Sequence, residues 1–340
     1  MREFIQKAEQ GCSLTETEMM QASEAMFNER TDNEDIKQFL LALKQKGETV
    51  DEIVGLVKVV RRHALQIDAT TQNIMDNCGT GGDGSQSFNI STCAAFVIAG
   101  AEVPIAKHGN RSISSKTGSA DVLEHLGVRL DFSAAEVRDL LTHNKIAFLF
   151  APHVHPGIKK VMKARKELGV PTIFNLIGPL TNPIELDTQL VGIYRRDMLE
   201  TMAEALNRLG RKRGVVISGA GHMDEASLEG INHLSIVQDG KVSTLQLSPE
   251  EVGLLSVPNE KIKGGDSMQN AEILRSILEG KHSAYRDTVL LNAGIALYAH
   301  GTADTIEKGI ELARKSIDSK AALRCLEELI RFSNQKELAQ

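Results

Sequence analysis

Residues 74–106 read IMDNCGTGGDGSQSFNISTCAAFVIAGAEVPIA, and this stretch decides the fold class. The short run 74–78 is taken as a β-strand, a glycine-rich loop follows it, and the apolar stretch 91–100 predicts a helix. A second β-rich run at 103–106 completes a strand–helix–strand unit. Such units build sheets with mostly parallel strands, and ligands bind beyond the carboxyl ends of those strands.

The alternation of strand and helix patterns continues toward the C-terminus, with β-rich runs at 147–150, 189–193 and 214–218. We therefore predict an α/β domain over 71–340 with a mostly parallel central sheet.

Residues 1–70 contain only helical patterns, so we predict a small all-helical N-terminal domain there. The sequence SLTE at 13–16 offers a capping box for one of its four helices. Helices from about 160–185 are expected to join this domain. The Gly-, Pro- and Asn-rich part of 159–182 is expected to act as a hinge between this domain and the α/β domain.

The composition is that of a globular protein without excess positive charge. The 340 residues carry a formal net charge of -6, with 4% aromatic residues and no Trp. These values argue against a nucleic-acid partner held by a basic surface or by base stacking.

The sequence also bears on the location of the protein and on the redox state of its thiols. The four cysteines lack the C-x-x-C spacing of zinc sites. The longest apolar run, 93–101, is far shorter than the roughly 20 residues of a membrane span, and residues 1–10 lack the apolar core of a signal peptide. We expect a cytoplasmic protein with reduced thiols and no membrane contact.

The glycine-rich loop formally matches G-x-G-x-x-G at Gly79, Gly81 and Gly84. A dinucleotide site, however, needs an acidic residue after the second strand, and this chain has the basic run 107–111 there. A P-loop is excluded because no Gly-Lys-Ser/Thr follows. A plain glycine-rich turn is the simplest alternative, but four glycines in six residues cost much backbone entropy.

The loop is better explained as an anion cradle. Its backbone amides approach a ligand closely, and Asn89, Ser91 and Thr92 add side-chain donors at the start of a helix. Asp83 would repel phosphate, so we expect it to accept ribose hydroxyls.

A second polar loop, KHGNRSISSKTGSAD at 107–121, follows the next strand. Lys107, Arg111 and Lys116 supply positive charge, and several serines supply hydroxyl donors. A solvated surface loop is the alternative, but two donor-rich loops at neighbouring strand ends indicate phosphate binding.

Three other groups are weaker signals on their own. Asp224 and Glu225 follow the strand at 214–218, and paired carboxylates at a strand end suit Mg²⁺ in a phosphate site. Arg165, His108 and His155 are not distinguished by spacing, and each is as readily structural.

Four segments together resemble the anthranilate phosphoribosyltransferase family: GTGGDGSQSFNIST, KHGNRSISSKTGSAD, FLFAPHVHPGIKKVMKARKELG and FNLIGPLTNP. The resemblance runs nearly end to end. It implies transfer of a phosphoribosyl group from 5-phosphoribosyl 1-pyrophosphate to the amine of anthranilate, the second step of tryptophan biosynthesis. It also implies Mg²⁺ dependence and a homodimer built through the helical domains.

Carried over position by position, the resemblance implies three sets of site residues. Contacts to phosphoribosyl pyrophosphate fall on Gly79, Gly82, Asp83, Ser87, Asn89, Ile90, Ser91, Thr92, Lys107, His108, Gly109, Asn110, Arg111, Ser112, Ile113, Ser114, Ser115 and Ser119. Contacts to anthranilate fall on Gly79, Asn110 and Arg165, with His108 and Pro152 nearby. The metal ligands fall on Ser91, Asp224 and Glu225.

Two departures are visible: Ser87 stands where Thr is more usual, and Pro171 stands where many relatives carry Arg. The second departure predicts weaker or altered recruitment of anthranilate, without an effect on the chemical step. Since the acceptor is a neutral aromatic amine, we predict no covalent enzyme intermediate.

Other functions stay open at this point. A pyrimidine-nucleoside phosphorylase of the same fold group would need one phosphate pocket, and the pair Asp224 and Glu225 disfavours it. A related transferase with another aromatic acceptor is compatible with Pro171. A catalytically silent sensor or a nucleic-acid-binding homologue is disfavoured by the complete set of site residues and by the net charge.

Overall fold

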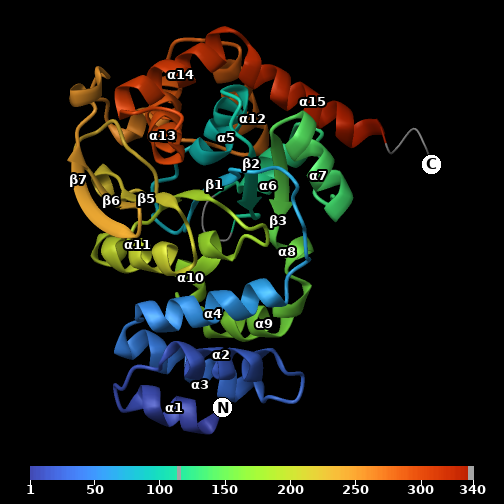
Figure 1. The fold of residues 1–340 in the computed structure, drawn as a ribbon, viewed down its shortest axis with the longest axis vertical. Coiled ribbons are helices and arrows are strands. Elements are labelled where there is room, and N and C mark those ends of the chain that lie inside the picture. The colour runs from blue at the N-terminus through green and yellow to red at the C-terminus, as the bar shows by residue number, and fades with distance from the viewer. Residues whose placement is uncertain (113–115, 336–340) are drawn as a thin grey trace.

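The computed structural model describes residues 1–112 and 116–335 (Figure 1). At one end of the molecule four helices form a bundle: α1 (Arg2–Glu9), α2 (Glu16–Phe27), α3 (Asn33–Lys46) and α4 (Val50–Arg62). The capping box predicted at 13–16 is wrong by two positions. Thr15 caps α2 and Glu18 returns a bond to the Thr15 backbone, because Thr15 is the extended residue just before the first helical turn.

A mixed seven-stranded sheet forms the centre of the remaining described chain, in the order β3-β2-β1-β4-β5-β6-β7. The strands are β1 (Met75–Gly79), β2 (Ile105–Gly109), β3 (Ile146–Phe150), β4 (Thr188–Gly192), β5 (Arg213–Ser218), β6 (Asn232–Gln238) and β7 (Lys241–Leu247). The first five are parallel and correspond to the five predicted runs, with bounds shifted by a few residues. β6 and β7 are antiparallel additions to this sheet and are not among the predicted strands. β7 is mostly exposed, so its sequence gives a weak apolar signal.

Helices cover both faces of the sheet (Figure 1). Most of the helices lie on one face of the sheet or beside its β3 edge. They are α5 (Ile90–Gly100), α6 (Ser119–His125), α7 (Ala134–His143), α12 (Ser267–Leu278), α13 (Ala284–His300), α14 (Ile306–Asp318) and α15 (Ala321–Gln335). α5 contacts α13, α14 and α15 as well as the sheet, and nearly all of its residues are buried. Its burial on all sides explains why its sequence is apolar throughout.

The other face is covered by α11 (Leu199–Arg208), and α4 of the bundle packs against α11. One apolar cluster runs from Leu40 of α3 and Val57 of α4 through Leu206 of α11 to Val216 of β5. The bundle and the sheet therefore share a continuous core.

Shorter elements connect these layers: α8 (Ala151–Val154), α9 (Lys159–Leu168), α10 (Phe174–Ile177), η1 (Pro156–Ile158), η2 (Gly178–Thr181), η3 (Arg196–Met198), η4 (Ala220–His222), η5 (Glu250–Val252) and η6 (Asn259–Ile262). α9 lies against α2 and α3 of the bundle, so a segment distant in sequence completes that end of the molecule. None of the helices in the described chain is both long enough and apolar enough to cross a bilayer.

Candidate active site

The glycine-rich loop leaves β1 at Gly79 and enters α5 at Ile90, so it lies at the carboxyl edge of the parallel strands. Three of its glycines have positive φ: Gly81 (71°), Gly82 (81°) and Gly84 (71°). L-residues are strained in that region, so the loop needs glycine there. Asp83 orders the loop from within, since its Oδ1 accepts from Ser85 N at 3.0 Å.

The carboxylates of Asp224 and Glu225 lie directly against this loop. Asp224 Oδ2 accepts from Gly81 N at 2.6 Å, and Glu225 Oε1 accepts from Ser91 N at 3.2 Å. Two segments more than a hundred residues apart thus meet at the start of α5.

Glycines at two strand ends make this approach possible. A Cβ on Gly192 would lie 1.6 Å from the Asp224 carbonyl oxygen, and one on Gly79 would lie 2.3 Å from Asp224 Oδ2. Here the glycines provide space rather than backbone freedom, because neither has a positive φ.

The carboxylates are held in an unfavourable electrostatic setting. Burial, together with repulsion from Asp83 and Glu225, raises the pKa of Asp224 well above its ordinary value. Burial raises the pKa of Glu225 to about 7, although Lys107 opposes the shift. The cluster is therefore short of positive charge.

A divalent cation suits this cluster by charge and by donor type. Within the described residues, no group of three or more His, Cys, Asp or Glu side chains is arranged to hold a metal ion. Mg²⁺ commonly takes one or two carboxylates and completes its octahedron with water and phosphate oxygens. Asp224, Glu225 and the Ser91 hydroxyl fit an ion that binds together with a phosphorylated substrate.

Lys107 and His108 belong to β2 rather than to the second loop, which begins at Asn110. The Lys107 side chain is buried, and its Nζ donates to Asn77 O at 2.5 Å and to Ser91 Oγ at 3.3 Å. The ammonium group consequently lies under the first loop, beside the start of α5.

The second loop lies beside the first. Asn89 Nδ2 donates to Thr117 O at 3.2 Å, and Ser119 Oγ accepts from Asn110 N at 3.2 Å. Arg111 is turned to α6, where its guanidinium pairs with Asp121 at 2.7 Å and Glu124 at 2.9 Å. The predicted contacts Ile113, Ser114 and Ser115 lie outside the described residues.

Arg165, the predicted anthranilate contact, lies on α9. Its guanidinium lies 5.2 Å from the Phe174 ring centroid and donates to Asn175 Oδ1 at 3.1 Å and toward Met162 Sδ at 3.1 Å. Burial lowers its pKa to about 10. In the described chain it forms no ion pair, so a carboxylate ligand would be its first anionic partner.

A cavity of about 210 Å³ is bordered by Pro171, Asn175 and Tyr194. Asn175 holds Arg165 on one side, and a Cβ on Gly82 would touch the Tyr194 ring at 3.5 Å on the other. A neighbour of Arg165 and a neighbour of the glycine-rich loop therefore border the same cavity, with Pro171 in its wall.

His108 and His155 pack edge to face, with ring centroids 5.2 Å apart. Burial lowers the pKa of His108 to about 3 and that of His155 to about 4, so both are neutral at pH 7. They contribute neutral, desolvated surface beside β2 and not positive charge.

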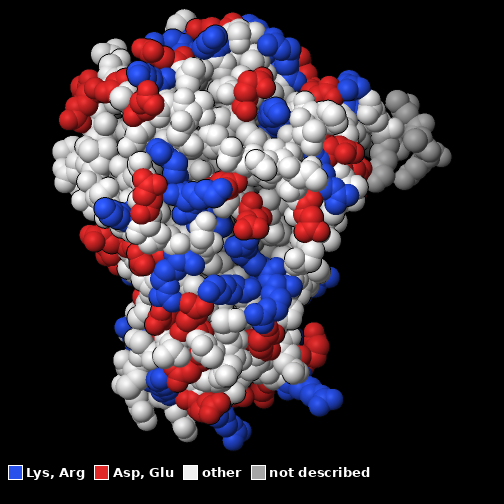
Figure 2. Space-filling model, viewed as in Figure 1, with Lys and Arg blue, Asp and Glu red and all other residues white. Residues whose placement is uncertain are grey.

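Positive charge also gathers on the visible surface. Figure 2 shows Lys and Arg side chains in a band across the molecule at the level of α9 and α10. Such a band favours the approach of anionic ligands.

Comparisons with known proteins agree with this geometry. Residues 2–64 match a family model described as the helical bundle domain of a glycosyl transferase family, and residues 71–323 match its a/b domain. Anthranilate phosphoribosyltransferase of Bacillus cereus strain AH187 is 55% identical over 336 residues, which cover 99% of this chain and 98% of the relative.

The chain belongs to the anthranilate phosphoribosyltransferase family. A crystal structure of the family member from Thermus thermophilus superposes with a TM-score of 0.92 at 39% identity, covering 97% of this chain and 99% of that one. The Saccharomyces cerevisiae member, in complex with PRPP and Mg, superposes with a TM-score of 0.90 at 28% identity, covering 98% and 97%.

Several residues that build this family member's site carry no signal in the sequence alone. Asp76 of β1 is fully buried and accepts from His108 N at 3.2 Å and from Asn182 Nδ2 at 3.1 Å. Asn270 Nδ2 donates to Asn89 Oδ1 at 2.8 Å. A usable signal was present at Gly192, since a glycine at the end of an apolar strand indicates a close approach by another part of the chain.

Proposed function

We propose that this chain transfers the phosphoribosyl group of 5-phosphoribosyl 1-pyrophosphate to the amino group of anthranilate, with release of pyrophosphate, in tryptophan biosynthesis. The carrying observation is that one chain, 55% identical to a named relative, places a carboxylate pair in contact with a glycine-rich anion loop and keeps a half-buried arginine that has no acidic partner among the described residues. The reaction is a pentosyl transfer: a C–N bond forms at ribose C1, the C–O bond to pyrophosphate breaks, and the amine loses a proton.

At the donor end, backbone amides and hydroxyls of the two loops would hold the phosphates, and Asp83 the ribose hydroxyls. Asp83 is already turned toward Asp224, whose amide donates to Asp83 Oδ2 at 3.4 Å. Donors fixed before the substrate binds stabilise the charge of the leaving group without reorganisation.

Mg²⁺ would be held by Asp224, Glu225 and Ser91, and when bound it would offset the negative charge of the departing pyrophosphate. The yeast relative forms a complex with PRPP and Mg, which supports the same cofactor here. The positive charge of Lys107, which opposes the rise in the pKa of Glu225, is expected to limit repulsion within the carboxylate pair.

At the acceptor end, Arg165 would form paired hydrogen bonds with the anthranilate carboxylate and so direct the amine toward C1. Asn175 holds the guanidinium in place. Asn110 and Gly79 are proposed as further contacts. The neutral amine needs no strong base, and no side chain is required as a nucleophile.

The direct test follows anthranilate fluorescence on mixing with 5-phosphoribosyl 1-pyrophosphate, with and without Mg²⁺. The expected result is a loss of fluorescence that requires both the sugar donor and the metal. Cleavage of uridine with inorganic phosphate, without Mg²⁺, would instead support a nucleoside phosphorylase. A transfer to another aromatic amine in preference to anthranilate would support a related transferase.

Assembly, location and domain division are part of the proposal. We propose a homodimer formed through the helical bundle, a cytoplasmic enzyme, and a division into domains near residue 70. The dimer rests on the family resemblance, and the location rests on the sequence features described above. Light scattering on the purified protein tests the dimer, with a mass near 37.1 kDa contradicting it.

A further inference from the structure

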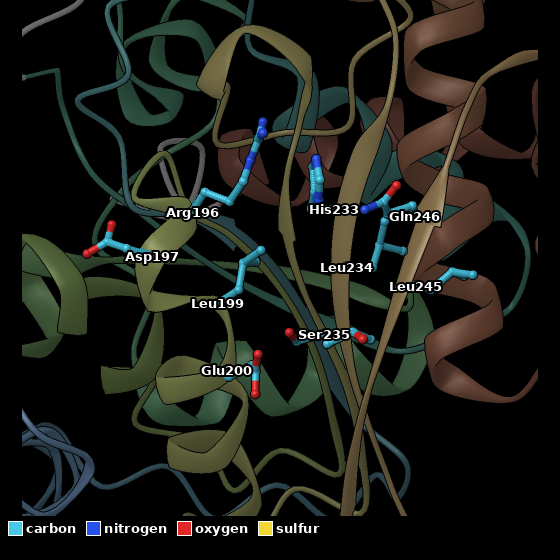
Figure 3. Close-up of a pocket in the computed structure, with 10 residues that line it drawn as sticks. Arg196, Asp197, Leu199, Glu200, His233, Leu234, Ser235, Leu245 and Gln246 are labelled. Carbon is cyan, nitrogen blue, oxygen red and sulfur yellow. The ribbon is translucent and has the colours of Figure 1, made fainter.

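The sheet opens between β1 and β2, the two strands that lead into the first and second loops of the candidate site. Within the described chain these strands pair at one position only, Met75 with Ile105, whereas β1 pairs with β4 and β2 with β3 over five residues each. Regular pairing is seen between β6 and β7, which pair along their whole length, with His233 opposite Gln246 (Figure 3). The opening therefore lies at the carboxyl ends of β1 and β2, where ligands of such sheets bind.

The backbone groups along this opening are those that a longer ladder would pair. Met75 N donates to Pro104 O at 2.9 Å, which is the first step of a parallel ladder. Bonds in such a ladder are evenly spaced, so the next step would join Asn77 N to Ala106 O. It would also join His108 N to Asn77 O. Neither strand makes this step.

Side chains bond these backbone groups instead. Asn182 Nδ2 donates to Ala106 O at 2.8 Å. Asp76 accepts from His108 N at 3.2 Å and from Asn182 Nδ2 at 3.1 Å. The carbonyl of Asn77 accepts from Nζ of the lysine under the first loop. The hydrogen bonds of the ladder are thus replaced without bringing the two strands together.

The carboxylate in the opening has an energetic cost. Asp76 and Asn182 are both 0% exposed. Burial raises the pKa of Asp76 to about 6, although the charge of Lys107 and the bond from Asn182 oppose the shift. A continued ladder would satisfy the same backbone groups without a buried carboxylate. A local arrangement that costs stability indicates that the opening serves the site.

We propose that Asp76 and Asn182 are positioning residues for the sugar donor, because together they hold β1 and β2 apart and so set the spacing of the first and second loops. Paired strands lie about 4.8 Å apart, and a closed ladder would bring Gly79 and Gly109 near that distance. An amide nitrogen lies about 2.8 Å from a charged oxygen that it binds, so a phosphate held by both loops needs a wider gap. The proposal rests on the transferase function, and both side chains act without touching the substrate.

Two variants test this role. Asp76→Asn keeps the shape of the side chain but sets one amide against another, and Asn182→Ala removes both bonds of the Asn182 amide. In each variant KM for 5-phosphoribosyl 1-pyrophosphate should rise about tenfold or more, and KM for anthranilate should change less than about threefold. Calorimetry with the donor and Mg²⁺, in the absence of anthranilate, should show the same loss of donor affinity.

Asn144→Ala is the matched control. Asn144 is buried at the end of α7, and its side chain donates to Cys325 O of α15 at 2.9 Å. This variant should lower the thermal unfolding temperature and leave both KM values unchanged. A merely structural role predicts the same result for Asp76→Asn and Asn182→Ala.

Donor KM and donor affinity that stay unchanged in the folded variants would overturn the proposal. A loss of affinity for anthranilate alone would overturn it too. Should Asn182→Ala fail to fold, Asp76→Asn, which keeps the size of its side chain, decides the question. A parent protein that binds the donor without consuming anthranilate would contradict the proposed function, while the calorimetric comparison would still test the spacing of the loops.

Discussion

The two ends of the candidate active site carry unbalanced charges of opposite sign. At the carboxylate end, burial and mutual repulsion raise the pKa values of Asp224 and Glu225. At the guanidinium end, burial lowers the pKa of Arg165, whose hydrogen-bond partners in the described chain are neutral. Both ends have lost hydration. Lys107 offsets the charge of the carboxylates only in part, and Arg165 has no acidic partner in the described chain, so each end can accept a ligand group of complementary charge.

The largest expected effect comes from removing the carboxylate end. Replacing Asp224 and Glu225 together by Ala should lower kcat by about a thousandfold or more. Mg²⁺ would lose its carboxylate ligands, and the negative charge of the leaving pyrophosphate would no longer be offset. Steady-state rates at saturating Mg²⁺ measure this effect. Glu229→Ala, an exposed carboxylate in the same segment, is the control; near-normal turnover of the double variant would remove the metal role from this pair.

The next effect tests whether the position of the carboxylates matters as well as their charge. Gly192→Ala places a Cβ 1.6 Å from the Asp224 carbonyl oxygen, so the segment must move. We expect a kcat about a hundredfold lower, as for a displacement of about 1 Å at a catalytic group. Gly230→Ala, where the nearest atom lies 3.7 Å away, should cost little. Equal rates for the two variants would show that the close approach is unimportant.

Removing the guanidinium end should separate the two substrates. Arg165→Ala is expected to raise KM for anthranilate by about ten- to a hundredfold and to leave KM for the sugar donor nearly unchanged. Lys166→Ala, the exposed neighbour on α9, is the control. An equal rise in both KM values would mean that Arg165 does not select the acceptor.

A smaller effect concerns stability and pH. The folded-state pKa of Glu225 is about 7, above the ordinary 4.5, so the unfolded chain releases this proton first as pH rises. Stability that is complete below pH 4.5 is therefore lost progressively up to about pH 7. Without Mg²⁺, Glu225→Gln should be more stable than the parent at pH 8 by about 1 kcal/mol and similar to it at pH 4.5.

Urea unfolding at the two pH values measures this difference. Added Mg²⁺ should stabilise the parent at pH 8 and not the Gln variant to the same extent. A stability difference that is constant with pH would contradict the raised pKa.

The smallest expected effect is at Cys78, which lies next to the carboxylate end. Burial raises its pKa to about 12, so the thiol is not ionised at neutral pH. Cys78→Ala should keep kcat within about twofold, like Cys12→Ala on the bundle surface. A complete loss of turnover with the fold intact would reveal thiol chemistry at this end.

Much of the fold was predictable because its elements follow local rules. The apolar stretch of α5 and the β-rich runs of the five parallel strands are strong signals in a single sequence. β7 is not, since an exposed edge strand such as Lys241–Leu247 lacks an apolar pattern. Thr15 and Ser13 are both plausible caps in sequence, and only the backbone conformation selects Thr15.

Residue type and family resemblance together select Asp224 and Arg165 as candidate site residues, and their roles stay predictions. The supporting contacts of the site were not predictable, because they depend on long-range packing. Nothing in the local sequence shows that Lys107 is buried under the first loop, or that Asp76 is bonded to Asn182. Arg111 is the opposite case. The sequence presents it as a basic residue of a polar loop, but in the structure its guanidinium pairs with the nearby carboxylates of Asp121 and Glu124.

The continuous apolar core between the bundle and the sheet constrains how the molecule can move. Swinging the bundle outward would expose that core, at about 25 cal/mol for each Å² of apolar surface. Sliding α9 and α10 a short way across their neighbours keeps the surface covered. We therefore expect Arg165 and the carboxylates of Asp224 and Glu225 to approach each other by a small sliding of packed helices. The substrates are expected to enter without separation of the helical bundle from the sheet.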